Sequence, residues 1–522
     1  MIEQTLIPYW RIDGTLTALG PLRIGNGTVL TGRIPRKVKK GDGQNEDSAV
    51  ETLGVFIDST GQAYIPGSSL KGFLRSFMDS RIANHSLIEV AFGYQKEASS
   101  AEGRGEGLGG AVTVWDTRIA EPEALPESVA DPYWDRTRAT CVGSHVVLDR
   151  RTRTASDELL FYEEYVPAGI GFDVTLLVEG GELEGWTVDD IAGALLAGLD
   201  ELRDSPARMG ASNADGWGHL EWKPKAVRRM CDKAIANWLS EPGSPLVDHL
   251  APADAAPLLT LGKAILDRKS TATVDFKIDL HFASPFLVND PSRVKQESGS
   301  SDQPNHTPLK APGGGPLLPA SSMRGALRSQ AERIARTLGM TVCNPAGKRS
   351  ERPPAVKTRQ DFDKLDAVGR LFGAPGWRSA VRVSDFTLAP ESPDPGDPRR
   401  QEFVAIDRFT GGGADKLKFN ADAFTPAGCE GFTLRGALSL DIGRLALLTD
   451  GASGWWNEPL HLLAYTLRDL CEGDIPVGFG RSKGYGACTA QVKLASGVAG
   501  NGCLPQGATD LIEGWFTERR NA

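Results

Sequence analysis

The 522-residue chain lacks the features that mark several large classes of protein. Its seven cysteines form no CxxC pair, and an odd, scattered set indicates buried thiols in a reducing cytoplasm, without a disulfide framework or a cysteine zinc site. It has no run of 18 apolar residues, and no basic segment followed by an apolar one at its N-terminus. We therefore expect neither a transmembrane helix nor secretion. The absence of GxxxxGK[ST] leaves nucleotide triphosphate hydrolysis unsupported.

The net charge and the histidine content limit the possible functions further. A net charge of −9 argues against a protein that coats nucleic acid indiscriminately, but it leaves a local basic groove open, because binding depends on where the charges lie. The seven histidines form no cluster, so neither a Ser-His-Asp nor a Cys-His site is predicted. One cationic cluster is present, which is either a solvated loop or part of a binding surface: Arg33, Arg36, Lys37, Lys39 and Lys40.

The most informative feature that is present is a repeated phrase. PGSSLKGFLRS at 66–76 returns 253 residues later as PASSMRGALRS at 319–329. Other landmarks recur in the same order and predict a tandem duplication. They are Phe92-Gly93 and Phe372-Gly373, VVLDR at 146–150 and VAIDR at 404–408, and the glycine-rich segments GASNADGWG at 210–218 and GRSKGYG at 480–486.

The pattern of apolar residues predicts an α+β fold in two similar halves. Period-3.6 patterns predict helices, and β-rich segments near 172–178 and 432–440 predict strands. We expect a first domain at 1–225, a helical connector at 226–270, a second domain at 271–495 and a C-terminal tail at 496–522. The predicted helices span 68–84, 187–204, 321–338 and 457–471.

The repeated phrase has the composition of an anion-binding helix start. Serines at its beginning are expected to cap each helix: Ser68 or Ser69, and Ser321 or Ser322. Two cations follow at i, i+4 spacing, where they repel each other and oppose the helix dipole. They are Lys71 and Arg75 in the first copy and Arg324 and Arg328 in the second. Their occurrence in both copies predicts a bound anion such as phosphate, although an ordinary amphipathic helix would also fit.

Glycine inside each predicted helix supports the same interpretation. Gly72 and Gly325 each cost roughly 1 kcal/mol relative to alanine, which predicts the close approach of another backbone. The glycine-rich segments offer backbone N–H groups, cations and a ring that could stack on a base. These residues are Trp217 in the first half and Arg481, Lys483 and Tyr485 in the second. A tight turn between helix and strand is the alternative.

Together, the PGSSLKGxLR phrase, the later Phe-Gly, the Asp-Arg-containing segment and the terminal glycine-rich loop resemble the CRISPR-associated RAMP superfamily. More narrowly, they resemble the backbone subunits of type III effector complexes of the Csm and Cmr classes. The resemblance covers about residues 10–225 and 270–492. Two fused units are similar to the fused backbone subunit of type III-D systems.

This resemblance implies a fold and a set of partners. Each unit would be a ferredoxin-like (RRM-like) domain with a β-hairpin thumb, at 145–166 and 403–426, that wedges between guide and target bases at about six-nucleotide intervals. Arg150 and Arg408 lie in these hairpins. The helix start and the glycine-rich loop would grip the guide backbone. The implied partners are CRISPR guide RNA, complementary target RNA and other effector subunits, with no membrane.

The resemblance also implies a metal-dependent cut of the target RNA by a loop aspartate that precedes the repeated phrase. In the second copy, Asp302-Gln-Pro304 fits the local pattern, Asp290 before Pro291 is an alternative, and His306-Thr-Pro308 occupies nearly the same frame. No Asp-x-Pro precedes the first phrase, where Glu51 and Asp47 are the candidates. Mg²⁺ or Mn²⁺ would assist attack by the 2′-hydroxyl on the adjacent phosphate.

Three functions are compatible with these features. The first is an RNA-guided endoribonuclease subunit that cuts target RNA in at least its second unit. The second is a scaffold that binds guide RNA while other subunits cut. The third is a guide-processing endoribonuclease of the wider RAMP class, which would need a histidine base that spacing does not reveal.

Overall fold

A computed structural model provides the coordinates of the chain. The structure describes residues 9–494 except for the following segments: 35–49, 83, 96–106, 130, 132, 149–154, 181–182, 184, 204–206, 242, 267–272, 291–303, 312–313, 345–350 and 447–456.

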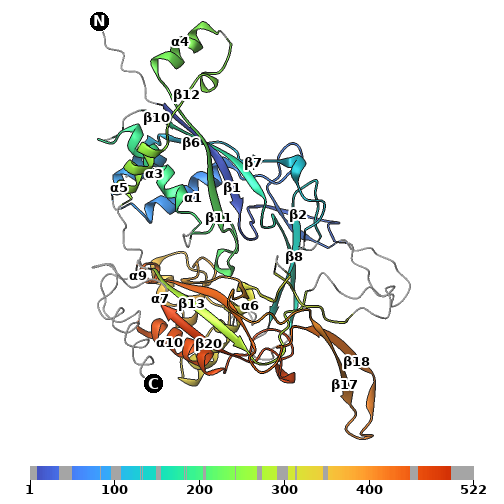
Figure 1. The fold of residues 1–522 in the computed structure, drawn as a ribbon. Coiled ribbons are helices and arrows are strands. Elements are labelled where there is room, and N and C mark those ends of the chain that lie inside the picture. The colour runs from blue at the N-terminus through green and yellow to red at the C-terminus, as the bar shows by residue number, and fades with distance from the viewer. Residues whose placement is uncertain are drawn as a thin grey trace. The chain divides into compact units, whose positions relative to one another are not determined.

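The chain divides into two compact units (Figure 1). The first contains the residues up to Gly143, together with Tyr162–Asn213 and Trp217–Thr271. The second contains Ser144–Phe161, Ala214–Gly216 and the residues from Ala272 onward. The outer part of a hairpin whose base belongs to the first unit is therefore grouped with the second.

The first unit is built on an antiparallel sheet with the order β12-β11-β1-β10-β6, in which β7 also pairs with β10. The strands are β1 (Tyr9–Ala18), β6 (Val112–Val114), β7 (Arg118–Ile119), β10 (Gly171–Glu179), β11 (Leu220–Arg229) and β12 (Ala251–Pro252). The helices are α1 (Gly67–Asp79), α2 (His85–Phe92), α3 (Val188–Asp200), α4 (Asp232–Ser240) and α5 (Ala256–Ile265).

Two smaller sheets complete this part of the chain. One has the order β2-β3-β9-β8 and contains the first hairpin, while the other pairs β4 with β5. The bounds are β2 (Gly25–Leu30), β3 (Thr52–Val55), β4 (Gly93–Gln95), β5 (Gly107–Gly109), β8 (Cys141–Leu148) and β9 (Ala155–Tyr165).

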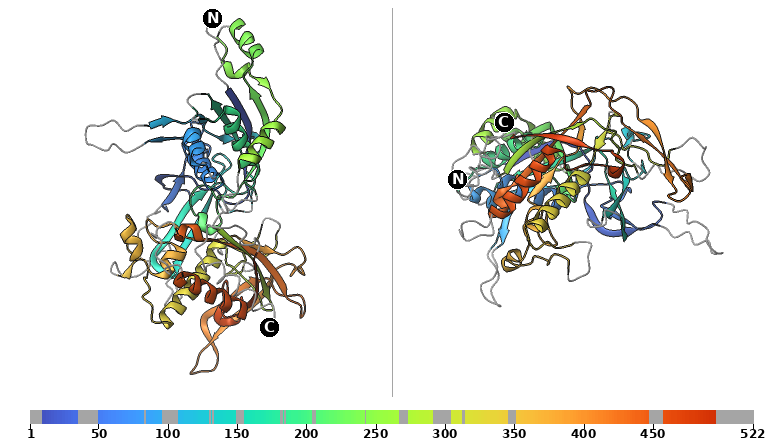
Figure 2. Two further views of the ribbon diagram at one scale, coloured as in Figure 1. Left: turned by 90° about the vertical axis from the view of Figure 1, so that its left-hand side faces the viewer. Right: turned by 90° about the horizontal axis from the view of Figure 1, so that it is seen from below.

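The second unit repeats this arrangement with the order β14-β16-β19-β13-β20, and β15 also pairs with β19. Its strands are β13 (Thr273–Phe282), β14 (Leu317–Leu318), β15 (Val381–Val383), β16 (Phe386–Leu388), β19 (Phe432–Asp441) and β20 (Cys488–Leu494). Its helices are α6 (Ala320–Thr337), α7 (Arg359–Asp363), α8 (Ala367–Phe372), α9 (Ile442–Ala446) and α10 (Asn457–Glu472). A hairpin of β17 (Arg399–Ile406) and β18 (Gly413–Ala423) extends from this unit as a two-stranded ribbon (Figure 2).

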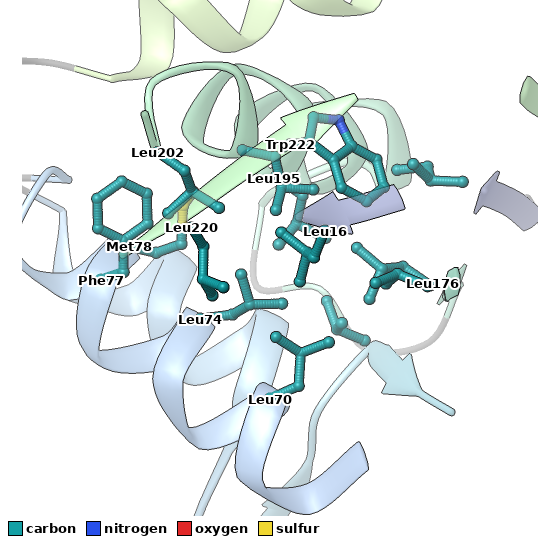
Figure 3. Packing of buried hydrophobic residues seen from close by; sticks show 14 of the residues in the cluster. Leu16, Leu70, Leu74, Phe77, Met78, Leu176, Leu195, Leu202, Leu220 and Trp222 are labelled. Carbon is teal, nitrogen blue, oxygen red and sulfur yellow. The ribbon is translucent and has the colours of Figure 1, made fainter. Parts of the chain in front are cut away.

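Alternation along the central strands places the core of each unit on one face of its sheet. In β1, Ile12 and Leu16 are fully buried, while Asp13 and Thr15 between them are partly exposed. Helix α1 covers this face with Leu70 and Leu74, and Leu195 of α3 packs beside them (Figure 3). In the second unit, α6, α8 and α10 contribute to the corresponding core.

Helix α3 is also covered on the side away from the sheet. Its residues from Ile191 to Leu199 are all buried, because α5 packs against it through glycine. A Cβ atom at Gly262 would overlap the carbonyl oxygen of Gly193, and one at Gly193 would lie 2.6 Å from the carbonyl oxygen of Leu258. These glycines therefore permit close contact between the two helices.

The prediction of an α+β chain with two sheet-bearing halves is confirmed. The four helices expected from periodicity correspond to α1, α3, α6 and α10. The segment at 226–270 begins with the end of β11 and contains α4, α5 and β12. Within the described residues, no helix has both the length and the apolar character needed to cross a membrane.

The contact between α3 and α5 generates a stability prediction. Gly262→Ala should destabilise the first unit, because overpacking costs roughly 1–3 kcal/mol and outweighs the gain in helix propensity of about 1 kcal/mol. Urea unfolding followed by far-UV circular dichroism measures the change. Gly72→Ala is the matched control, because a Cβ there meets nothing within 4 Å. Equal effects of the two substitutions would contradict the described packing.

Candidate nucleic-acid interface

Each repeated phrase opens its helix at proline, and a distant carboxylate caps the helix. Pro66 and Pro319 are the N-cap residues. The Gly67 N–H donates to Asp116 Oδ1 at 2.8 Å, and the Ala320 N–H donates to Asp385 Oδ1 at 2.7 Å. A carboxylate at this place also complements the positive end of the helix dipole.

The prediction that serine caps these helices is therefore wrong. Ser68, Ser69, Ser321 and Ser322 lie within the first helical turn, where no side-chain cap bond is formed. Sequence reasoning missed the true caps because each comes from the loop after a short strand far along the chain. The signal that could have found them is Val-x-Asp, which occurs at 114–116 and again at 383–385.

The cations of the repeated phrase have partners within the chain. Lys71 Nζ donates to the Val112 carbonyl at 2.7 Å, and burial together with the nearby Arg75 charge lowers the pKa of Lys71. Arg324 donates to the Phe372 carbonyl at 2.5 Å, and Arg328 to the Gly373 carbonyl at 3.3 Å.

Phe372 and Gly373 end α8, where the helix dipole is negative and attracts cations. Arg324 also forms an ion pair with Asp215 at 3.1 Å. The repulsion between cations that predicted an external anion is therefore offset at least in part inside the protein. These contacts do not require a bound phosphate.

What the two helices do expose is a ridge of small residues. Ser68, Gly72 and Ser76 are exposed at i, i+4, i+8 spacing on α1, and Ser321 and Gly325 are exposed at the equivalent places on α6. A Cβ at Gly72 or Gly325 would meet nothing within 4 Å. The predicted close approach of a backbone is thus not made by the described part of this chain, and the surface is open to an external ligand.

The rings of the glycine-rich segments pack against the hairpins. Trp217 lies 5.0 Å from the Tyr165 ring at the end of β9. Tyr485 is only 3% exposed, lies 5.8 Å from Phe403 of β17, and donates its hydroxyl to Gln401. The predicted stacking of Tyr485 on a base does not fit this burial, because the hairpin already covers the ring.

The exposed part of the second glycine-rich segment is cationic. Arg481 and Lys483 are exposed, between Gly480 and Gly484 in the left-handed conformation. Lys483 Nζ lies within 5.2–6.0 Å of three phenylalanine ring centroids, which favours the cation. Those rings belong to Phe403, Phe419 and Phe479.

His306 packs beside this cationic segment. Its ring lies 4.4 Å from that of Phe479. Burial and the Lys483 charge lower the pKa of His306. The imidazole is therefore neutral near pH 7.

Both hairpins carry a stacked cross-strand ring pair that sequence reasoning missed. The His145 and Phe161 rings lie 5.2 Å apart, and the Phe403 and Phe419 rings lie 4.9 Å apart. Each second-hairpin ring stands 258 residues after its first-hairpin counterpart, which is also the offset of the Asp-Arg pair. That shared offset could have identified the pairs.

The tip of the second hairpin is a hydrogen-bonded turn. Asp407 Oδ1 accepts from the Phe409 N–H at 2.8 Å and from the Thr410 N–H at 2.9 Å, and these bonds help to lower the pKa of Asp407. Phe409 is 99% exposed, and Arg408 is exposed beside it. Arg150, predicted for the same place in the first hairpin, lies outside the described residues.

A buried carboxylate fixes the base of the first hairpin. Glu164 is fully buried on β9 and accepts from Arg138 Nε at 2.7 Å and from Thr140 Oγ1 at 2.7 Å. Burial alone would raise the pKa of Glu164, but these bonds, the Val55 N–H and the Arg138 charge hold it below its ordinary value.

Arg33, which the sequence analysis placed in a cationic cluster, also belongs to this network. It lies 3.5 Å from Glu164 and pairs with Asp135. It is therefore an internal cation of the first unit. The other four cations of that cluster lie outside the described residues.

The sheet faces opposite the helices are occupied by internal ion pairs. Asp13 on β1 pairs with Arg11 at 2.9 Å and with Arg228 at 2.6 Å. In the second unit, Asp279 on β13 pairs with Arg435 at 2.6 Å. Asp13 and Asp279 thus present paired charges at places where stacking rings would be needed, so the helix ridges, loops and hairpins are better candidates for contact with nucleic acid.

The candidate catalytic carboxylates fall into different environments. Asp290 is 5% exposed, and its N–H donates to the Thr307 carbonyl at 2.8 Å. Glu51 is exposed just before β3. Asp302 and Asp47 lie outside the described residues.

The candidate carboxylates could hold a divalent ion only together with ligands from the RNA. One exposed loop carboxylate per site matches Mg²⁺ chemistry when substrate phosphates supply further oxygen ligands. Among the described residues, the one group of three acidic side chains that could surround an ion is Asp469, Glu472 and Asp474. Asp469 is already engaged by Gln330 at 2.6 Å and by Arg468 at 2.8 Å, and Arg468 also lies 3.9 Å from Glu472, so contacts at the C-terminal end of α10 account for this group.

The distant caps generate a second prediction. Asp116→Ala and Asp385→Ala should each cost about 0.5–2 kcal/mol, because the first helical N–H loses its acceptor. Faster hydrogen exchange at the Gly67 and Ala320 amides would accompany the loss. Ser68→Ala is the matched control and should change neither quantity appreciably. An equal cost for Ser68→Ala and Asp116→Ala would disprove the assignment of the cap.

Comparison with known proteins agrees with the duplicated architecture. The model of the RAMP superfamily matches residues 15–221 and again residues 273–489. No curated protein matches the chain. The two matched segments carry the two sheets and the two repeated helix starts, and together they cover most of the chain. The chain therefore belongs to the RAMP superfamily, whose members are CRISPR-associated RNA-binding proteins.

Proposed function

We propose that this protein is a two-unit backbone subunit of a type III CRISPR effector that binds guide RNA and complementary target RNA. The observation that carries the proposal is the exposed serine–glycine ridge, which occurs at the same place on α1 and α6. Gly72 and Gly325 each destabilise their helix by about 1 kcal/mol relative to alanine, although a Cβ atom at either position would meet nothing within 4 Å. A sugar–phosphate backbone lying against the ridge would explain why glycine, and not alanine, stands at this place in both units.

The strand order supports a ferredoxin-like domain in each unit. Taking the strands of the first unit in chain order as β1, β6, β10 and β11, their spatial order is 4-1-3-2, and all pairs are antiparallel. The second unit gives the same order with β13, β15, β19 and β20. In the proposal, the hairpins act as thumbs, and the exposed Phe409 and Arg408 reach the bases and phosphates of the guide–target duplex.

The proposal includes cleavage of the target RNA by a loop carboxylate with Mg²⁺ or Mn²⁺. A bound divalent ion would neutralise charge on the scissile phosphate while the neighbouring 2′-hydroxyl attacks it. Asp302, Asp290, Glu51 and Asp47 are the candidates to hold that ion. The chain's own task is to hold the RNA so that the hydroxyl, the phosphorus and the leaving oxygen lie in line.

The ridge generates a third prediction, in which stability and binding change in opposite directions. Gly72→Ala and Gly325→Ala should stabilise the fold by up to about 1 kcal/mol, yet weaken binding of guide RNA, because each added methyl group separates the helix from the RNA. Thermal unfolding and filter binding measure the two quantities.

The matched control for the ridge is Ala236→Gly on α4, an exposed helical position. It should lose stability by a similar amount without affecting RNA binding. Unchanged RNA affinity in both ridge variants would refute the proposed interaction.

The carboxylates generate a fourth prediction. In the assembled effector with guide RNA and Mg²⁺, Asp302→Ala should abolish one target cut, and Glu51→Ala or Asp47→Ala should affect only a cut made by the first unit. Mapping of the cleaved ends measures each position separately. Cutting at full rate after Asp302→Ala, Asp290→Ala, Glu51→Ala and Asp47→Ala together would exclude this catalytic role.

A scaffold without nuclease activity is the second candidate, and the burial of Asp290 favours it. An enclosed carboxylate cannot meet an RNA phosphate without local rearrangement, so the described residues contain only one exposed candidate, Glu51. The two functions differ in whether complementary RNA is cut or only bound when Mg²⁺ is present. A guide-processing activity is less well supported, because His306 is partly buried and its ring packs against Phe419 and Phe479.

A further inference from the structure

The second unit contains a cluster of three arginines that lies outside the duplicated features. Arg382 lies on β15, Arg378 precedes that strand, and Arg444 lies on α9. Strand β15 pairs with β19 so that Arg382 stands opposite Ser439. Val381 and Val383 on either side are buried in the core. Alternation along the strand therefore directs Arg382 to the opposite face of the sheet.

Hydrogen bonds and ring contacts bring the other members of the cluster to this place. The Asp441 N–H donates to the Ala380 carbonyl at 2.9 Å, and Asp441 Oδ1 accepts from the Arg444 N–H at 2.8 Å. The Arg444 guanidinium lies 5.3 Å from the centre of the Trp377 ring. Segment 377–383, the end of β19 and the start of α9 thus converge on one site.

The guanidinium groups of this cluster are left without the partners that such groups normally have. Among the described residues, none of the three side chains forms a hydrogen bond or an ion pair, and Arg382 Nε is enclosed without an acceptor. Burial, and the charges of the neighbouring arginines, lower the pKa of Arg382 and of Arg444. An enclosed charged donor without an acceptor is costly.

Two carboxylates face the cluster and only partly compensate for it. Asp441 and Asp275 both attract Arg382, but neither forms an ion pair with it. Asp441 is engaged by the start of α9, and Asp275 Oδ1 is itself enclosed without a partner. Arg378 is exposed, so the site is open to solvent on its side.

We propose that Arg378, Arg382 and Arg444 form a phosphate-binding site that is specific to the second unit. A planar guanidinium group can donate two parallel hydrogen bonds to two oxygens of one phosphate. A bound phosphate would therefore supply the acceptors that the cluster lacks. The first unit lacks these two arginines at the aligned positions: when β6 is aligned with β15, Thr113 replaces Arg382 and Gly109 replaces Arg378. The site therefore distinguishes two otherwise similar units, and its ligand is either a free phosphate or the backbone of an RNA strand.

The first experiment uses the full chain and inorganic phosphate. Thermal unfolding is followed as phosphate replaces chloride at constant ionic strength. Phosphate should raise the midpoint of the wild type, and Arg382→Gln or Arg378→Gln should weaken the apparent affinity by about tenfold or more. Arg378 is exposed, so Arg378→Gln keeps the test valid if Arg382→Gln does not fold.

Lys357→Gln removes an exposed cation from the same unit and is the control that should behave as the wild type. Equal phosphate-dependent midpoints in the wild type and both arginine variants would overturn the proposal. An equal loss in Lys357→Gln would also overturn it, because the effect would then reflect net charge alone.

The second experiment identifies the source of the phosphate, and this arm rests on the proposed function. Binding of single-stranded RNA is measured across salt concentrations for the wild type and for Arg378→Gln. If RNA occupies the site, the slope of log K against log salt should fall by about 0.7 for each RNA phosphate that the variant no longer neutralises. An unchanged slope in a variant that no longer responds to phosphate assigns the site to free phosphate. A wild type that binds phosphate and no RNA would refute the proposed function while leaving this site intact.

Discussion

One hydrogen bond, from the first N–H of a helix to a carboxylate far along the chain, determines how each half of this protein presents its surface. Asp116 and Asp385 occupy the position that a serine of the repeated phrase was expected to fill. The bond fixes the start of the helix against the loop after the neighbouring short strand. With the apolar side of the helix buried against the sheet, its serine–glycine ridge is left facing outward.

The same arrangement explains why basic residues are tolerated at the start of these helices. Arg324 and Arg328 donate to carbonyls at the end of α8, and Lys71 donates to a strand carbonyl. Cations that would otherwise oppose the dipole of their own helix are thereby stabilised by oriented carbonyl groups. The serines and the glycine of the ridge remain on the surface, so packing separates the residues that hold the helix from those that are available to a ligand.

The two units share this framework but differ at the tip of the hairpin and around Arg382. The second hairpin ends in an exposed Phe409 held by a hydrogen-bonded turn, while the first has Arg151 at the equivalent place in the sequence. Arg382 and Arg378 of the second unit are replaced by Thr113 and Gly109 at the aligned positions of the first. Both units keep the contacts that support each helix and hairpin, together with the exposed serine–glycine ridge, whereas the hairpin tip and the positions of Arg378 and Arg382 differ between them.

The sequence by itself determined the duplication, the α+β class, the principal helices and the family, because these depend on local periodicity and on phrases that recur in order. It misassigned the helix caps and did not reveal the burial of the Tyr485 ring, because both depend on partners distant in the chain. A hydroxyl beside a helix start looks like a cap until a carboxylate from another loop reaches the first N–H. A ring in a glycine-rich turn looks available until a hairpin packs against it. Only the tertiary structure decided these points, because burial and hydrogen bonding between distant segments are properties of the folded chain.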